Sequence, residues 1–172
     1  MDSATLRANQ APLKAQYKSD PSTALVTLKT SGTLSNTSIA CKISTGAAIK
    51  EAGLHPLTGG NALSGELCSG DMLLEALVAC AGVTLKAVST ALEIPIRDGK
   101  VLAEGDLDFR GTLGVSKEAP VGFKAIRLRL ELDTDAEKEK LDTLLKLTER
   151  YCVVLQTITQ KPELSCGIVK NE

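Results

Sequence analysis

The clearest pattern along the chain is the alternation of apolar and charged residues between positions 126 and 132. Apolar residues stand at every second position, at Ile126, Leu128, Leu130 and Leu132. A period of two is typical of a strand that buries one face and exposes the other. Similar reasoning predicts N-terminal strands within residues 1–45, a β-ribbon over residues 97–133 and a last strand at residues 164–170.

Two further segments are predicted to be helical. Residues 71–92 are apolar on all sides, which indicates a central, buried helix. Residues 134–160 begin with a Thr-x-x-Glu capping box, place leucines at helical spacing, and either continue as one helix or kink near Arg150. The order of strands, long helix, strands, helices and strand predicts an α+β fold in a single domain, residues 1–172. Residues 44–70 are the least regular part, and a loop of this length inside a domain is often functional.

Composition narrows the classes of function. The 172 residues carry a net charge of −1 and include no tryptophan and few aromatic residues, which argues against a nucleic-acid-binding surface. Residues 1–10 are polar and show no secretory signal, and the longest apolar run, residues 76–85, is too short to span a bilayer. The five cysteines contain no Cys-x-x-Cys pair, unlike a secreted disulfide framework. We therefore expect a cytoplasmic protein with no membrane segment.

The candidate chemistry rests on two of these cysteines. Cys80 and Cys152 lie in the two predicted helical segments, and each is either a small core residue or a reactive thiol. The sole histidine, His55, has no partners at zinc-ligand spacing, and neither a Gly-x-Ser-x-Gly elbow nor a phosphate-binding loop occurs. We expect no metal and no organic cofactor. Cys41 and Cys166 lie in strand-like segments and are predicted to be core residues.

The sequence segments around Cys80 and Cys152 resemble those of a known protein family. A glycine-rich loop leads into the helical segment from Ser69 to Cys80, and a β-ribbon and a second helix with Tyr151-Cys152-Val153-Val154 follow. This resembles the OsmC/Ohr family of osmotically induced and organic-hydroperoxide-resistance proteins. The resemblance implies two β-sheets around two central helices in an intertwined homodimer, with each active site at the dimer interface.

The resemblance also implies roles for individual residues. Cys80 corresponds to the family's peroxidatic cysteine and Cys152 to its resolving cysteine. The family places a glutamate ten residues before the first cysteine, where this chain has Gly70, so Asp71 is the nearest carboxylate. The family's N-terminal arginine has no clear counterpart, because Arg7 is the only arginine before position 32.

A buried cysteine needs help to ionise, because desolvation raises the pKa of a thiol. A cation beside Cys80 would favour the reactive thiolate. We predict that a basic residue supplies it: Lys18 or Lys14 in the first place, Arg127 or Arg129 otherwise. Asp71 would anchor that cation. It also has a purely structural interpretation, since an acid at a helix start stabilises the first turn, and nine helical residues turn its side chain away from Cys80.

The implied function is a thiol-dependent peroxidase acting in oxidative-stress defence. It would reduce an organic hydroperoxide, with fatty or alkyl hydroperoxides favoured by the aliphatic surroundings, through a Cys80 sulfenic acid that Cys152 resolves. An external dithiol would then reduce the disulfide. Cys68, in the loop before the first helix, is an alternative resolving thiol. Two other interpretations remain open: a non-catalytic dimer that binds a small lipophilic ligand in its interface pocket, and a structural protein with inert thiols.

Overall fold

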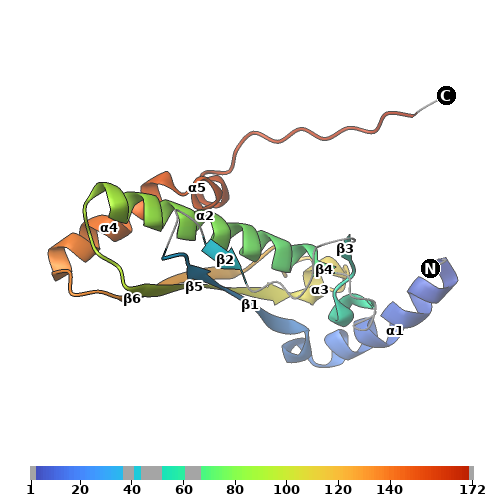
Figure 1. Cartoon of the computed structure of the whole chain (residues 1–172). Coiled ribbons are helices and arrows are strands. Elements are labelled where there is room, and N and C mark those ends of the chain that lie inside the picture. Colours follow the sequence, from blue (N-terminus) through green and yellow to red (C-terminus); the bar gives the residue numbers. More distant parts are fainter. Residues whose placement is uncertain (1–2, 37–40, 44–51, 61–66, 171–172) are drawn as a thin grey trace.

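A four-stranded antiparallel sheet forms the base of the molecule, and helices cover one of its faces (Figure 1). The computed structural model describes residues 3–36, 41–43, 52–60 and 67–170. The strand order is β2-β1-β5-β6, with the bounds β1 Leu25–Leu34, β2 Cys41–Ile43, β5 Asp98–Asp108 and β6 Ala125–Asp133. A minimal parallel pair, β3 Ala52–Gly53 and β4 Leu67–Cys68, leads into the longest helix. The α+β class is confirmed.

The alternation in β6 sets the two faces of the sheet. Its leucines and Ile126 are half-buried against the core, while the intervening residues point to the outer face. There Arg127 pairs with Asp106 and Glu104 of β5, and the hydroxyl of Thr27 on β1 donates to Asp106 at 2.6 Å. The charged face is therefore solvated, and the apolar face receives the helices.

Helix α2, Ser69–Ala91, is the central helix that the apolar run predicts, and it begins two residues earlier than expected. Leu74, Leu77, Val78, Ala81 and Leu85 are fully buried where it packs on the sheet. Among the described residues, α2 is the one helix long and apolar enough to cross a membrane by length and composition, a test that the core helices of soluble proteins also pass.

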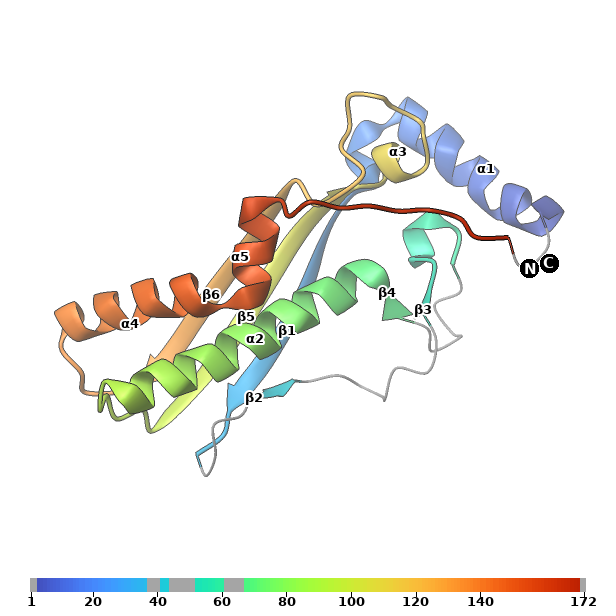
Figure 2. The ribbon, with the colours of Figure 1, turned by 90° about the horizontal axis from the view of Figure 1, so that it is seen from above.

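The second predicted helical segment is two helices, α4 Lys138–Tyr151 and α5 Val153–Gln160. Figure 2 shows α4 running antiparallel to α2 over the same face of the sheet, with α5 turning away at its end, beside the middle of α2. The bend lies at Cys152, two residues after the expected kink position. The sulfur of Cys152 is thereby brought to the flank of the central helix.

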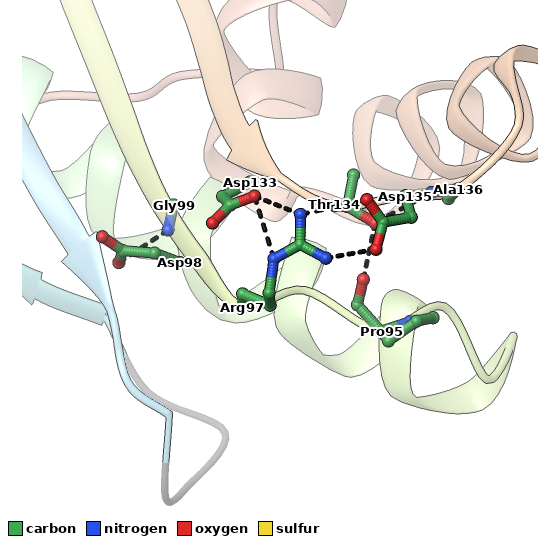
Figure 3. Close-up of polar contacts among 8 residues, drawn as sticks. All are labelled: Pro95, Arg97, Asp98, Gly99, Asp133, Thr134, Asp135 and Ala136. Carbon is green, nitrogen blue, oxygen red and sulfur yellow. Dashed lines mark hydrogen bonds and ion pairs between the residues drawn. The ribbon is translucent and has the colours of Figure 1, made fainter.

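The predicted capping box at the start of residues 134–160 does not form. Thr134 donates its hydroxyl to the carbonyl of Pro95 at 2.6 Å, and α4 begins at Lys138 without a side-chain cap. Figure 3 shows why: Arg97 binds the carboxylates of both Asp133 and Asp135. These contacts join the turn after α2 to the turn after β6. The long-range hydrogen bonds and ion pairs therefore replace the local capping box that the sequence predicts.

At the chain ends, the predicted N-terminal strands occur as β1 and β2 behind a helix that the patterns do not predict, and the prediction of a last strand is wrong. Residues 3–19 form a helix, α1 Ser3–Ser19, followed by a short 3-10 helix at Pro21–Ala24, so within residues 1–45 the described strands are β1 and β2 alone. Residues 1–2, 37–40 and 44–45 lie outside the described residues. The predicted last strand at residues 164–170 is an exposed extended segment without a strand partner among the described residues. An isolated segment cannot form a sheet, because its backbone groups have nothing to pair with.

The predicted β-ribbon over residues 97–133 corresponds to β5 and β6, which pair antiparallel from Asp98 with Asp133 to Asp106 with Ala125. Between them lies a short helix, α3 Phe109–Thr112. It is capped by the buried carboxylate of Asp108, which also binds Arg110. The ring of Phe123 covers Gly105, where a β-carbon would lie 2.3 Å from the ring.

Candidate functional site

Cys80 and Cys152 lie side by side, close enough to share a hydrogen bond between their sulfurs. Both are reduced. Cys80 stands in the middle of α2 and is half-buried, while Cys152 is fully buried. The structure therefore brings together the two thiols that the sequence singles out, although they are far apart along the chain.

Local backbone geometry at Cys152 creates this meeting. Its φ of −71° and ψ of 102° leave the helical region, so it ends α4 and starts α5. Its amide donates to the carbonyl of Thr148 at 3.0 Å, and its own carbonyl accepts from the amide of Gln156 at 2.9 Å. Since one residue caps both helices, the sulfur lies at the exact point where the free amides of α5 begin.

The first amides of α5 point at the sulfur of Cys80. Burial alone raises the pKa of this thiol, but hydrogen bonds from the amides of Val154 and Val153, the thiol of Cys152 and the hydroxyl of Thr84 outweigh it. The net effect is a pKa below the ordinary value for cysteine. Free amides at a helix start carry partial positive charge, which favours a thiolate.

Cys152 responds in the opposite direction. Its pKa is raised to about 11, because burial and the hydrogen bond to Cys80 together outweigh the lowering effect of the amides of Leu155 and Val154. One member of the pair is thus suited to lose its proton and the other to keep it. Two neighbouring groups whose pKa values are pushed apart have distinct chemical roles: here a nucleophile and a proton donor.

The predicted thiolate-stabilising cations lie elsewhere within one chain. Lys14 and Lys18 are on α1, which packs against α3 and the short 3-10 helices at Pro21–Ala24 and Pro56–Thr58, beyond the N-terminal end of α2 (Figure 2). Arg127 is held on the outer face of the sheet, and Arg129 pairs with Glu131. Among the described residues, the shift at Cys80 arises from hydrogen bonds to neutral groups instead. The roles of Lys14 and Lys18 stay a prediction.

Asp71 lies in the first turn of α2, and the charge that faces it is that of His55. Burial raises the pKa of Asp71, and His55 acts against this rise. Burial lowers the pKa of His55, against the influence of Asp71. Nine residues at about 1.5 Å each place Asp71 roughly 13 Å along the axis from Cys80. Asp71 therefore has no direct contact with the sulfur pair in one chain.

The sequence offers no signal for the setting of His55 beyond its position before a proline. Its Nδ1 accepts the amide of Leu57 at 3.1 Å, which caps the short 3-10 helix at Pro56–Thr58. Its ring packs on Phe109 with centroids 4.8 Å apart. Burial and then the charge of Asp71 raise the pKa of Glu75, so this end of α2 gathers acidic groups away from the cysteines.

The remaining cysteines are placed apart from the pair. Cys68 precedes α2, and its Sγ accepts the amide of Gly70 at 3.4 Å. It lies about three turns from Cys80, too far to bridge to it without rearrangement. Cys166 is exposed, so its prediction as a core residue is wrong, and the side chain of Cys41 lies outside the described residues. Within the described part of the chain, no group of three or more His, Cys, Asp or Glu residues could hold a metal ion.

An apolar groove of about 990 Å³ is lined by residues one helical turn from each of the two cysteines. Its walls come from β6, α2, α4 and α5, and leucines dominate the lining, among them Leu77 one turn before Cys80 and Leu155 one turn after the bend. Thr148 also lines it, and its hydroxyl is buried without a hydrogen-bond partner in the described structure. The helical spacing of α4 predicts an apolar residue at this position, so this polar group is a departure from the pattern.

Comparisons with known proteins agree with this architecture. A family model described as OsmC-like protein matches residues 60–166. The crystal structure of an OsmC-like hydroperoxide resistance protein from Jannaschia sp. CCS1 superposes with a TM-score of 0.55 at 16% identity, covering 82% of this chain and 91% of that one. At this identity the likeness concerns the fold. No curated protein matches the chain.

Proposed function

This chain belongs to the OsmC-like protein family, and we propose that it is a thiol-dependent peroxidase that reduces organic hydroperoxides in oxidative-stress defence. The observation that carries the proposal is that the sulfurs of Cys80 and Cys152 are in hydrogen-bond contact and have pKa values shifted in opposite directions. The pKa of Cys80 is lowered by hydrogen bonds, whereas that of Cys152 is raised by burial. A hydroperoxide reductase needs one thiolate to attack and one thiol to follow it.

In the first step, the thiolate of Cys80 attacks the terminal oxygen of the hydroperoxide. The O–O bond breaks, Cys80 becomes a sulfenic acid, and the alkoxide leaves. Cys152 gives its proton to the alkoxide, which departs as an alcohol. This transfer becomes easier as the reaction proceeds, because the negative charge on Cys80 that helps to raise the pKa of Cys152 is consumed.

In the second step, the thiolate of Cys152 attacks the sulfur of Cys80. An S–S bond forms and the sulfenic oxygen leaves as hydroxide, so the two thiols have supplied the two electrons that reduced the peroxide. A disulfide needs Cα atoms roughly 4.4–6.8 Å apart, and sulfurs already in hydrogen-bond contact meet most of that demand. An external dithiol then restores both thiols by exchange.

We further propose that the protein works in the cytoplasm as a homodimer. Proteins of the family are typically dimeric, and the extended C-terminal segment presents bare apolar side chains, with Leu164 at 90% and Ile168 at 100% exposure. Such surface favours burial by a second copy. In that dimer Lys14 or Lys18 of one subunit, anchored by Asp71, would lie at the active site of the other. Neither a metal nor an organic cofactor takes part.

Mass spectrometry after mixing with cumene hydroperoxide tests the peroxidase. The wild-type protein should lose two hydrogens, and this loss should disappear in both Cys80→Ser and Cys152→Ser. Cys68→Ser is the matched control and should form the disulfide normally, because Cys68 lies at the far end of α2. An unchanged mass, with both thiols still free under native conditions, would refute the proposal.

The second candidate function is non-catalytic binding of a small lipophilic ligand. The groove of about 990 Å³ favours it, since its volume is typical of small-molecule sites and its lining is mostly apolar. A protein of this kind would bind octyl alcohol equally well as wild type and as Cys80→Ser, and would show no thiol-dependent consumption of cumene hydroperoxide. Turnover of the peroxide by the wild type alone would exclude this candidate.

A further inference from the structure

Thr148 carries a buried hydroxyl that no described residue satisfies. Its side chain is 1% exposed, and Oγ1 has no hydrogen-bond partner in the described structure. An unpaired buried hydroxyl is unfavourable, because it has given up its bonds to water without replacement. Such a group therefore needs an explanation.

The neighbouring helical threonines show the usual solution. Thr143 donates to the carbonyl of Glu139 at 2.9 Å, and Thr159 donates to that of Leu155 at 3.0 Å. Each hydroxyl is thus satisfied by the preceding turn of its own helix. Thr148 makes no such bond within the described structure and lies instead in the wall of the apolar groove.

The place of Thr148 in the groove links it to the reacting sulfurs. Its carbonyl accepts the amide of Cys152 at 3.0 Å, so the threonine is one helical turn from the resolving cysteine. Leu77, which also lines the groove, is one turn from Cys80. A molecule that fills the groove would therefore lie against a mostly apolar lining, with one hydroxyl that has no partner in the described structure one turn from Cys152.

We propose that the hydroxyl of Thr148 is a specificity-determining contact, which binds the oxygen of an elongated aliphatic ligand lying in the groove. The proposal rests on the proposed function for the identity of that oxygen: an alkyl hydroperoxide as substrate and the corresponding alcohol as product. The leucines hold the alkyl chain, and the contact with Thr148 fixes which part of it lies nearest the cysteines. A few placed polar groups in an apolar site commonly set orientation in this way.

Binding of octyl alcohol, measured by titration calorimetry, tests the contact without requiring catalysis. Thr148→Val keeps the shape of the side chain and removes the hydroxyl. It should weaken binding about 3- to 10-fold, the effect of one neutral hydrogen bond. Thr148→Ser should bind nearly as the wild type does. Octyl chloride, which accepts hydrogen bonds poorly, should bind Thr148→Val and wild type alike.

Thr159→Val is the matched control, because Thr159 lines the same groove but already spends its hydroxyl on its own helix. It should leave the affinity for octyl alcohol unchanged. Urea unfolding supplies a second readout: Thr148→Val should be at least as stable as wild type, since it removes an unpaired buried polar atom. A Thr148→Val protein that is less stable yet binds octyl alcohol normally would overturn the proposal.

The outcomes separate this inference from the peroxidase itself. If Thr148→Val weakens alcohol binding but the wild type does not reduce cumene hydroperoxide, the contact stands and the peroxidase fails. If the wild type reduces the peroxide but Thr148→Val binds the alcohol as tightly as before, the contact fails alone. If octyl alcohol does not bind and Thr148→Val alters only the concentration dependence of dimer formation, a second copy fills the groove and the inference is overturned.

Discussion

Substitution of Val153 by proline removes one amide donor from the thiolate while leaving the helix intact. Val153 is the first residue of α5, a position that proline favours because its amide makes no bond within the helix and its φ suits the helical turn. Cys152, which precedes it, already has the extended backbone that a residue before proline prefers. The side chain of Val153 is 70% exposed, so its loss disturbs little packing.

The size of the effect follows from the strength of the lost bond. A hydrogen bond to a charged group is worth about 1.5–3 kcal/mol, which corresponds to roughly a 10- to 100-fold change in the ratio of thiolate to thiol. The amide of Val153 stabilises the charged form of Cys80, so its loss raises the pKa of that thiol. A more basic thiolate is also a better nucleophile, with a Brønsted coefficient of about 0.4–0.5, which offsets about half of the loss on a logarithmic scale. We therefore expect Cys80 of Val153→Pro to react roughly 3- to 10-fold more slowly than Cys80 of the wild type, at pH values below the pKa of Cys80 in either protein.

The assay is the pH dependence of iodoacetamide alkylation at Cys80, followed by peptide mass spectrometry. Val153→Ala is the control, because it removes nearly the same side chain and keeps the amide. The midpoint for Val153→Pro should lie at higher pH than that for Val153→Ala, with circular dichroism unchanged. Equal midpoints in the two variants would refute the idea that α5 amides ionise the cysteine.

Three other outcomes are expected. Cys152→Ala removes both the proton donor and the resolving thiol, so peptide mapping after excess cumene hydroperoxide should find Cys80 carrying two added oxygens; a Cys80 that stays reduced would contradict the assigned roles. In the wild type, alkylation of Cys152 should remain slow until the pH approaches about 11, its raised pKa, whereas Cys80 reacts at lower pH; overlapping profiles would argue against divided acidities. Gly105→Ala should cost about 1–3 kcal/mol of unfolding free energy in urea, because the new β-carbon would overlap the ring of Phe123; adding Phe123→Leu should recover part of that cost, and strictly additive losses would show that the two residues do not clash.

The strong periodic patterns in the sequence predict one strand of the sheet and the central helix that packs against the sheet. The alternation at residues 126–132 and the apolar run over residues 71–92 correspond to β6 and α2 because each pattern matches one buried surface. The N-terminal helix was missed, since residues 3–19 are largely polar and contain Pro12, which weakens any helical signal. The capping box at residues 134–137 failed because Thr134 bonds across to Pro95, a long-range contact that no local rule can see.

The sequence singles out the two cysteines that the fold brings together, but not the groups that surround them. The resemblance to a family points to both cysteines, and the structure places them in contact, while their roles stay a prediction. The expected charged stabiliser of Cys80 is replaced within one chain by amides of residues 153 and 154, which every non-proline residue possesses. The polar character of Thr148 is visible in the sequence, but whether its hydroxyl finds a partner depends on packing between distant segments, which no local pattern encodes.

The bend at Cys152 means that the proposed activation of Cys80 depends on the path of the backbone. The two amides are oriented by the bend in the backbone and not by the identity of a side chain. Most substitutions therefore leave them in place, whereas a site stabilised by a lysine or arginine loses its stabilising group when that residue is replaced. The changes that would remove or misdirect these two amides are proline at residue 153 or 154, an insertion, a deletion, or a straightened helix. Related sequences should therefore vary freely in side chains at the junction of α4 and α5, but should keep the length of the chain there constant.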